Sequence, residues 1–231
     1  MKKPSPSGRV NVPEAFNGPY SNVIIGTYGV DLDFLENHLL HRMPSRLRSR
    51  VFLADATQLN TAMRSGYAPK RTNRTHVVAP VYTPHAFHVK FILLTGPEHG
   101  RLLVGSGNIS VGGYIGAGEA FTTYDVTPED LTHAPKIASV RRFLHQLNET
   151  YPIDSQAWNL IQDQLTQAPW IPANTTDSGI THNLHESHLA QLADAIGTEP
   201  VTEVVAYAPF HDRKADGLQS IIGTLQPKSL T

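Results

Sequence analysis

One segment, Phe87–Thr95, constrains the fold of this chain of 231 residues more than any other. Alternate side chains of an extended strand point to opposite faces, and after Lys90 the run Phe-Ile-Leu-Leu is apolar on both faces. A strand of this kind is typical of the middle of a sheet that helices cover above and below. The turn-forming residues 95–100 predict that the chain then returns in an antiparallel partner strand at 101–106.

The rest of the chain alternates strand and helix signals, which predicts an α/β fold with a mixed sheet flanked by helices. Further strands are expected at 22–28, 50–54, 76–82, 119–126 and 201–208. Helices are expected at 31–43, 55–65, around 137–147, and at 155–167, 186–196 and 215–225. With 40% apolar and 17% charged residues, the chain can bury a core.

Loop-forming residues predict how the chain divides. Residues 1–20 are rich in Pro, Ser, Gly and Asn and are expected to form a flexible N-terminal arm. Residues 21–167 then form a complete first lobe, and the Pro, Gly, Asn and Thr residues of 168–180 form a linker. Residues 181–231 are expected to begin a second, truncated lobe, because a single β-α unit leaves its helix only partly covered.

Composition limits the classes of function. A formal net charge of −1 gives no support for an obligate, sequence-blind nucleic-acid binder. The absence of Cys excludes a disulfide framework, a thiolate nucleophile and a Cys-based zinc site. No apolar run follows the two N-terminal Lys residues, and none anywhere approaches 18 residues. We therefore expect a cytoplasmic protein with no membrane partner.

Polar residues that carry chemistry bracket the expected hairpin. His88 and Lys90, two positions apart, would share one face of a strand about 7 Å apart. Pairing of the hairpin would bring Asn108, at the end of a Gly-Ser-Gly-Asn segment, back beside them. This set suits a phosphodiester, since His88 could attack phosphorus while Lys90 and Asn108 bind the non-bridging oxygens. Gly105 and Gly107 would let the backbone approach a ligand closely.

These residues resemble the signature of the phospholipase D superfamily of phosphodiesterases, His-x-Lys followed by Gly-Ser-x-Asn. The likeness extends loosely over residues 22–225 and includes Val23–Tyr28 and Tyr207–Phe210. It implies hydrolysis of nucleic-acid phosphodiesters without metal or cofactor, through a phosphohistidine on His88. It also implies that substrate binding involves Ser106, Gly105, Gly107 and Glu119.

Two departures from the family pattern qualify the resemblance. Thr95 stands where the family usually has Asp, so the chain looks more like the His-Lys-Asn variant of tyrosyl-DNA phosphodiesterases, with Glu119 as a candidate support for His88. Family members combine two motifs, because one His attacks and the other protonates the leaving group, and no second motif follows here. The second His is therefore expected from a homodimer partner or from a C-terminal lobe missing from this sequence.

Other functions stay open on the sequence alone. A phospholipid phosphodiesterase would use the same three residues but should carry an apolar membrane-facing surface, which the sequence does not show. A non-catalytic half-site, which holds phosphate or nucleic acid without cleaving it, fits the single motif. In a purely structural interpretation, His88, Lys90 and Asn108 only satisfy backbone groups of a capped hairpin.

Two further clusters have a structural and a functional interpretation. His182, His185 and His188 recur every three residues, so they are either solvated at the start of a helix or the ligands of a divalent metal. Basic residues are concentrated in one part of the sequence, which is either a solvated surface or a groove for a nucleic-acid backbone, with Tyr67 stacking on a base. They are Arg46, Arg48, Arg50, Arg64, Lys70, Arg71 and Arg74.

Overall fold

The structure is a computed structural model that describes residues 11–116, 118–173, 180–206 and 214–231. The chain divides into two compact units, Met1–Gly179 and Ile180–Thr231, which we describe separately. The strands of the first unit are β1 (Asn22–Thr27), β2 (Ser49–Asp55), β3 (Val77–Val81), β4 (Phe91–Thr95), β5 (Gly100–Gly105) and β6 (Phe121–Val126). Its helical segments are α1 (Val12–Ala15), α2 (Leu32–Phe34), η1 (Leu35–Leu39), α3 (Leu40–Arg42), α4 (Ala56–Met63), α5 (Val111–Tyr114), α6 (Ala134–Thr150) and α7 (Ser155–Thr166).

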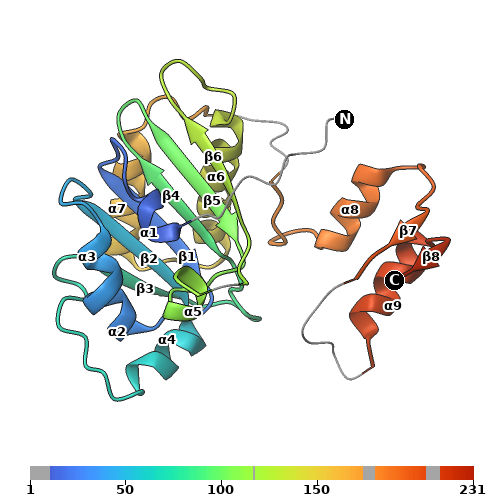
Figure 1. Cartoon of the computed structure of the whole chain (residues 1–231), viewed down its shortest axis with the longest axis horizontal. Coiled ribbons are helices and arrows are strands. Elements are labelled where there is room, and N and C mark those ends of the chain that lie inside the picture. Colours follow the sequence, from blue (N-terminus) through green and yellow to red (C-terminus); the bar gives the residue numbers. More distant parts are fainter. Residues whose placement is uncertain (1–10, 117, 174–179, 207–213) are drawn as a thin grey trace. The chain divides into compact units, whose positions relative to one another are not determined.

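The six strands form one mixed sheet in the order β3-β2-β1-β4-β5-β6 (Figure 1). Strands β1, β2 and β3 are parallel, whereas β4, β5 and β6 join them by antiparallel pairing. All five residues of β4 are buried, and β4 pairs with β5 in the register Phe91 opposite Val104. The predicted α/β class, the hairpin and the central strand are therefore confirmed.

Helices cover both faces of the sheet (Figure 1). On one face lie α6 and α7, and the rings of Phe91 in β4 and Phe143 in α6 meet edge to face with centroids 6.3 Å apart. On the other face Ile25 and Ile92 join a buried cluster with apolar residues of α1 and of segment 32–42. Covering helices on both sides explain why the central strands are apolar on both faces.

The first unit extends beyond the expected boundaries of its lobe. Val12, Phe16 and Tyr20 are buried, so residues 11–20 pack onto the core and do not form the expected flexible arm. At the other end, the Trp170 indole donates a hydrogen bond to the Gly96 carbonyl at 2.9 Å, which ties the start of the expected linker to the hairpin turn. The remainder of the arm, 1–10, and residues 174–179 lie outside the described residues.

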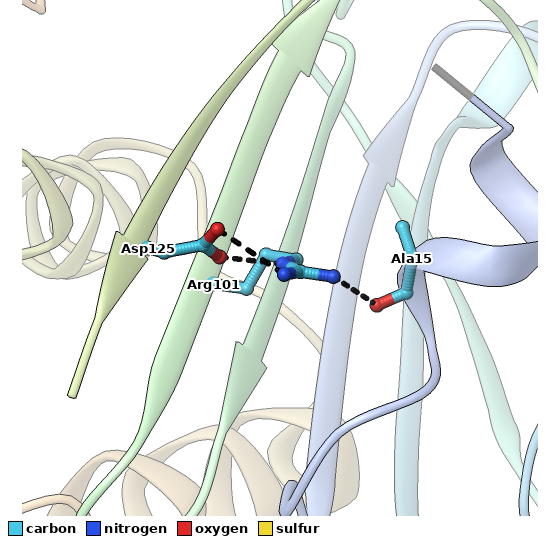
Figure 2. A network of polar contacts seen from close by, with 3 residues as sticks. All are labelled: Ala15, Arg101 and Asp125. Carbon is cyan, nitrogen blue, oxygen red and sulfur yellow. Dashed lines mark hydrogen bonds and ion pairs between the residues drawn. The ribbon is translucent and has the colours of Figure 1, made fainter.

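Arg101 of β5 links three separate segments of the first unit (Figure 2). Its guanidinium donates to both carboxylate oxygens of Asp125 in β6, at 2.5 and 3.1 Å. The same group donates to the Ala15 carbonyl at the end of α1, at 3.2 Å. The hydrogen bonds with Asp125 raise the pKa of Arg101. This side chain therefore fastens the N-terminal segment to the outer strands of the sheet.

Replacing Arg101 by alanine is expected to lower the free energy of unfolding by about 1–2 kcal/mol. A partly exposed ion pair contributes up to about 1 kcal/mol, and the Ala15 carbonyl also loses its donor. Urea unfolding followed by circular dichroism measures the change. Arg101→Lys keeps the charge without the fork geometry, so its free energy of unfolding should lie between those of the wild type and the alanine variant. Equal stability of the alanine variant and the wild type would contradict this role.

The expected helix at 31–43 is divided by a π-helical turn, so that α2, η1 and α3 follow one another without a break. Its start is as predicted, because the Asp31 side chain caps the helix by accepting the Phe34 N–H at 2.9 Å. The π-helical turn contains Glu36, whose side chain is 1% exposed. An ionised side chain at this depth requires hydrogen-bond partners.

Those partners come from a loop more than thirty positions further along the chain. The Glu36 carboxylate accepts the backbone N–H groups of Lys70, Arg71 and Thr72 at 2.7, 2.8 and 2.7 Å. It also accepts the hydroxyl groups of Tyr67 and Thr72 at 2.9 and 3.0 Å. Burial alone raises the pKa of Glu36, but these donors outweigh it and lower the pKa to about 2. Glu36 is thus ionised, and its carboxylate holds the loop 67–72 in place.

The second unit contains α8 (His188–Ile196), β7 (Glu203–Val204), α9 (Asp216–Leu225) and β8 (Ser229–Leu230). Its helix-strand-helix order agrees with the expected elements, and β8 adds a short parallel partner for β7. The expected strand at 201–208 is shorter in the structure, and its last two positions lie outside the described residues. In the described parts of both units, no helix has the length and apolar character needed to cross a membrane.

Candidate active site

His88 and Lys90 lie in the extended segment that leads into β4, and not within the strand as predicted, because β4 begins at Phe91. The Lys90 Nζ atom is 3.0 Å from His88 Nδ1 and 3.1 Å from His88 Nε2, so the ammonium group is in direct contact with the imidazole ring. The Lys90 carbonyl accepts the Gly105 N–H at 3.1 Å. This backbone contact sets the segment beside the end of β5, from which Asn108 follows.

The ring of Tyr28, directly after β1, contacts both His88 and Lys90. The rings of Tyr28 and His88 have centroids 4.6 Å apart and a tilt of 51°. Lys90 Nζ lies 5.6 Å from the centroid of the Tyr28 ring, within the range of a cation–π interaction. Gln58 in α4 donates to the Tyr28 hydroxyl at 3.1 Å and so limits the rotation of the ring.

Asn108 is anchored to the same loop, one residue further along. Its Oδ1 atom accepts the Gly29 N–H at 3.0 Å and lies 3.5 Å from the Thr27 hydroxyl. A backbone N–H can only donate, so this bond places Oδ1 toward Gly29 and leaves Nδ2 as the free donor end. Within the described residues, Asn108 Nδ2 has no hydrogen-bond partner. The loop 27–29 therefore brings the His-Lys pair and an amide donor to one edge of the sheet.

Asp55, at the carboxyl end of β2, holds the segment just before His88. Its Oδ2 atom accepts the Phe87 N–H at 2.9 Å, and its Oδ1 atom accepts the N–H groups of Thr57 and Gln58, both at 3.0 Å. The side chain is 5% exposed. In the sequence Asp55 stood out only as the first residue of the expected helix 55–65, so its contact with Phe87 was missed.

Tyr28 was missed as well, yet a signal for both residues was present. Each directly follows or ends a strand of the parallel part of the sheet. Ligand sites of α/β sheets gather at the carboxyl ends of such strands. A polar or aromatic residue at this position of β1 or β2 was therefore a candidate from the predicted topology alone.

The environment of His88 favours the neutral imidazole. Partial burial lowers the pKa of His88, the Lys90 ammonium lowers it further, and the Asp55 carboxylate opposes both effects. Burial likewise lowers the pKa of Lys90, and Glu119 opposes that effect. Because only the unprotonated ring has a lone pair to donate, His88 stays available as a nucleophile or base to lower pH than an ordinary histidine.

The pKa of His88 is expected to lie below 6.5 and to rise when Lys90 is replaced by methionine, which removes a neighbouring positive charge. Asp55→Asn should shift the pKa in the opposite direction, since the Asp55 charge favours the protonated ring. Titration of the histidine ring signals by NMR, assigned with a His88→Gln variant, measures both shifts. A wild-type pKa at or above 6.5, or a fall in the Lys90→Met variant, would contradict this account of the site.

The predicted substrate-binding residues make contacts within the protein. The Ser106 hydroxyl donates to Glu119 and accepts the Ala120 N–H, so Glu119 pairs with Ser106 and makes no hydrogen bond to His88. A Cβ atom added at Gly107 would lie 2.3 Å from the Gly113 carbonyl oxygen. The glycine is therefore required where the Asn108 loop packs on α5, whatever its part in ligand approach.

The remaining candidates lie apart from this edge. Thr95, at the other end of β4, is buried and faces Asn22, whose amide is 3.5 Å from its hydroxyl. His182, His185 and His188 do not converge, since no group of three or more potential metal ligands forms among the described residues. Tyr67 is tied to Glu36 by its hydroxyl group. The expected resemblance at Tyr207–Phe210 falls outside the described residues.

Comparisons with known proteins agree with the geometry at the level of the fold. No family model and no curated protein matches the sequence. Yeast tyrosyl-DNA phosphodiesterase superposes with a TM-score of 0.51 at 10% identity, over 86% of this chain and 49% of its own. A variant of that enzyme gives 0.50 at 10% identity, over 84% and 47%. The chain has a phospholipase D-like fold.

The phospholipase D-like fold is shared without close similarity of sequence. The chain spans about half the length of the yeast enzyme. NucT from Helicobacter pylori superposes over 61% of this chain and 86% of its own at 10% identity, with a TM-score of 0.40, below the level that indicates a common fold. The similarity establishes the architecture alone, and the chemistry depends on the residues at the sheet edge.

Proposed function

We propose that this chain forms half of a phosphodiesterase site for nucleic acid, centred on His88, Lys90 and Asn108. The observation that carries the proposal is the convergence of an imidazole, an ammonium 3.0 Å from it and an oriented amide donor next to the loop 27–29. A phosphodiester needs a nucleophile and donors for its non-bridging oxygens. The fold neighbour named tyrosyl-DNA phosphodiesterase supports the same class of reaction.

In this mechanism a ring nitrogen of His88 attacks phosphorus, a P–N bond forms, and the bond from phosphorus to the leaving oxygen breaks. Lys90 and Asn108 Nδ2 bind the non-bridging oxygens, whose negative charge grows in the transition state. The leaving oxygen takes a proton from a general acid. Water then attacks phosphorus and gives a proton to the group that acted as general acid, the P–N bond breaks, and His88 returns to the neutral state. Asp55 contributes to these reaction steps by positioning the backbone that carries His88.

The general acid has to come from elsewhere. His88 cannot protonate the leaving group while it is bonded to phosphorus, and protonation by a positioned acid typically contributes about 10²–10⁴-fold to the rate. In the described residues, the groups with recorded contacts to His88, Lys90 and Asn108 include no second histidine. We therefore propose that a second copy of the chain, or a second lobe, supplies it.

The second unit supports the two-lobe alternative. The first unit ends at residue 179 of 231, so a superposition on the yeast enzyme that covers 86% of the chain must include part of the second unit. The proposal that residues 181–231 begin a second phospholipase D-like lobe is consistent with this extent. For a homodimer, activity should instead rise with the square of protein concentration where the dimer is scarce.

Incubation of the purified chain with labelled single-stranded DNA or a phosphatidyl ester, each with EDTA present, tests the proposal. Where a second copy of the chain supplies the acid, cleavage of the DNA that survives chelation is expected, because the nucleophile is imidazole and not a metal-bound hydroxide. Cleavage of the phosphatidyl ester alone would identify a phospholipid, and not nucleic acid, as the substrate. A chain that binds DNA but does not cleave it at any protein concentration, and that does not hydrolyse a nitrophenyl ester of a nucleoside phosphate either, would favour the non-catalytic half-site.

A further inference from the structure

The first unit has a pocket at the opposite edge of the sheet from His88. It lies at the amino ends of β1, β2 and β3, where Asn22, Ser49 and Val77 are among its lining residues. Its volume is about 670 Å³, within the usual range of ligand sites. The six residues of β1 separate it from the candidate active site by about 20 Å. A ligand here would not occupy the His88 site.

The pocket has a strongly positive lining. Arg46, Arg48, Arg50 and Arg74 contribute to it, and no Asp or Glu does. None of these four guanidinium groups forms a salt bridge with a described residue. Four like charges around one concavity, without a carboxylate, form a site complementary to an anion.

Hydrogen bonds within the protein hold two of the arginines in place and still leave donors available. The Nε atom of Arg46 donates to the Gly18 carbonyl at 2.5 Å, and the Nε atom of Arg50 donates to the Leu47 carbonyl at 2.7 Å. A guanidinium group has five N–H donors, so the four N–H bonds of each terminal fork are not used by these contacts. Such forks match the oxygens of a phosphate group in geometry.

The other two arginines are carried by short, ordered backbone segments. The Arg48 N–H donates to the Ser21 carbonyl at 2.8 Å. Arg74 lies in a tight loop in which Asn73 adopts a left-handed conformation, with φ of 60°. The Asn73 N–H donates to the His76 carbonyl at 2.7 Å, and the Arg74 N–H donates to the Arg71 carbonyl at 3.0 Å. These contacts fix the backbone from which the two exposed side chains extend at the rim of the pocket.

We propose that this pocket binds the phosphate groups of an anionic ligand, separately from the candidate active site. Phosphate is favoured because Arg forks supply the charge, while Ser49, Thr75 and Asn22 add uncharged polar groups. Apart from the buried His76, no aromatic side chain lines the pocket, so it offers no platform on which a base would stack. The site therefore recognises phosphates and not bases, whether they belong to a free oligophosphate or to a nucleic-acid backbone.

Calorimetric titration with inorganic tripolyphosphate tests the site, using the full chain in a Lys90→Ala background so that the His88 site is disabled. One site per chain is expected, and adding Arg48→Ala with Arg74→Ala should weaken binding at least tenfold. Both arginines are exposed, and circular dichroism confirms folding. As a matched control, Arg64→Ala removes an exposed arginine that does not line the pocket and should change affinity less than twofold.

The design separates this site from the proposed phosphodiesterase. Loss of all binding in the Lys90→Ala background, an unchanged affinity in the double variant, or an equal loss in the Arg64 control would overturn the proposal, even if His88 is catalytic. Retained binding would support it even if His88 is not. Competition with a short single-stranded oligonucleotide then distinguishes the sources of phosphate: displacement identifies a nucleic-acid backbone, and its failure identifies a free oligophosphate.

Discussion

Replacing His88 by alanine is expected to reduce hydrolysis of a nitrophenyl ester of a nucleoside phosphate by about 10³-fold or more. Removal of a covalent nucleophile leaves only binding and charge stabilisation to act on the ester. Lys90→Ala removes one charged donor to the transition state and should cost about 10²–10³-fold. The release of nitrophenolate, followed spectrophotometrically with EDTA present, measures both rates.

His99 provides a matched control for the histidine substitution. It lies in the turn at the far end of the same hairpin, where its carbonyl accepts the Gly96 N–H at 2.8 Å. His99→Ala removes an imidazole from the hairpin without touching the candidate site, so its rate should stay within about twofold of the wild type. A rate for His88→Ala equal to that of the control would remove His88 from the mechanism.

Replacing Glu36 by alanine is expected to lower the free energy of unfolding by about 3–5 kcal/mol. The substitution leaves three backbone N–H groups and two hydroxyl groups without their acceptor in a buried place, and such a network ranks among the costly losses. Urea unfolding followed by circular dichroism measures the loss. Asp33→Ala is the control, because its exposed carboxylate accepts only from Asn37. A loss below about 1 kcal/mol for Glu36→Ala would contradict the role of Glu36.

The pH dependence of stability tests the charge of Glu36 independently. A carboxyl group with its pKa lowered from 4.5 to about 2 contributes stability that is fully present above pH 4.5 and is lost as pH falls toward 2. The shift corresponds to about 3 kcal/mol. Glu36→Gln keeps the size of the side chain but should lack this part of the acid destabilisation. Parallel stability curves for the wild type and Glu36→Gln between pH 5 and 2 would show that Glu36 is not held as a carboxylate.

The sequence predicted the hairpin well because its information is local. A run that is apolar on both faces, a turn and a matching strand lie within twenty residues, and they determine that β4 is central. The approach of Asn108 to the hairpin start followed from the same pairing. The exact start of β4 did not, because His88 and Lys90 are held by contacts with Tyr28 and with Asp55 through Phe87, all remote in sequence.

What the sequence did not show depends on distant partners. Residues 11–20 look like a loop by composition, yet Phe16 and Tyr20 complete the core on one face of the sheet. Glu36 looks like a solvated helix residue until the loop that begins at Tyr67 closes over it. The basic residues have two different roles that the sequence did not separate. Arg48 and Arg74 line one pocket, whereas the backbone N–H groups of Lys70 and Arg71 bind Glu36.

The covalent step at His88 is the central claim, and burst kinetics measure it directly. A nitrophenyl ester suits this test because nitrophenolate departs without a proton, so the missing general acid is not needed. Rapid mixing should give a burst of nitrophenolate approaching one per chain, with a nucleotidyl adduct on the His88 peptide by mass spectrometry after an alkaline quench. Both signals should be absent from His88→Ala. Turnover without an adduct on His88, or an equal burst from the folded His88→Ala variant, would contradict the account.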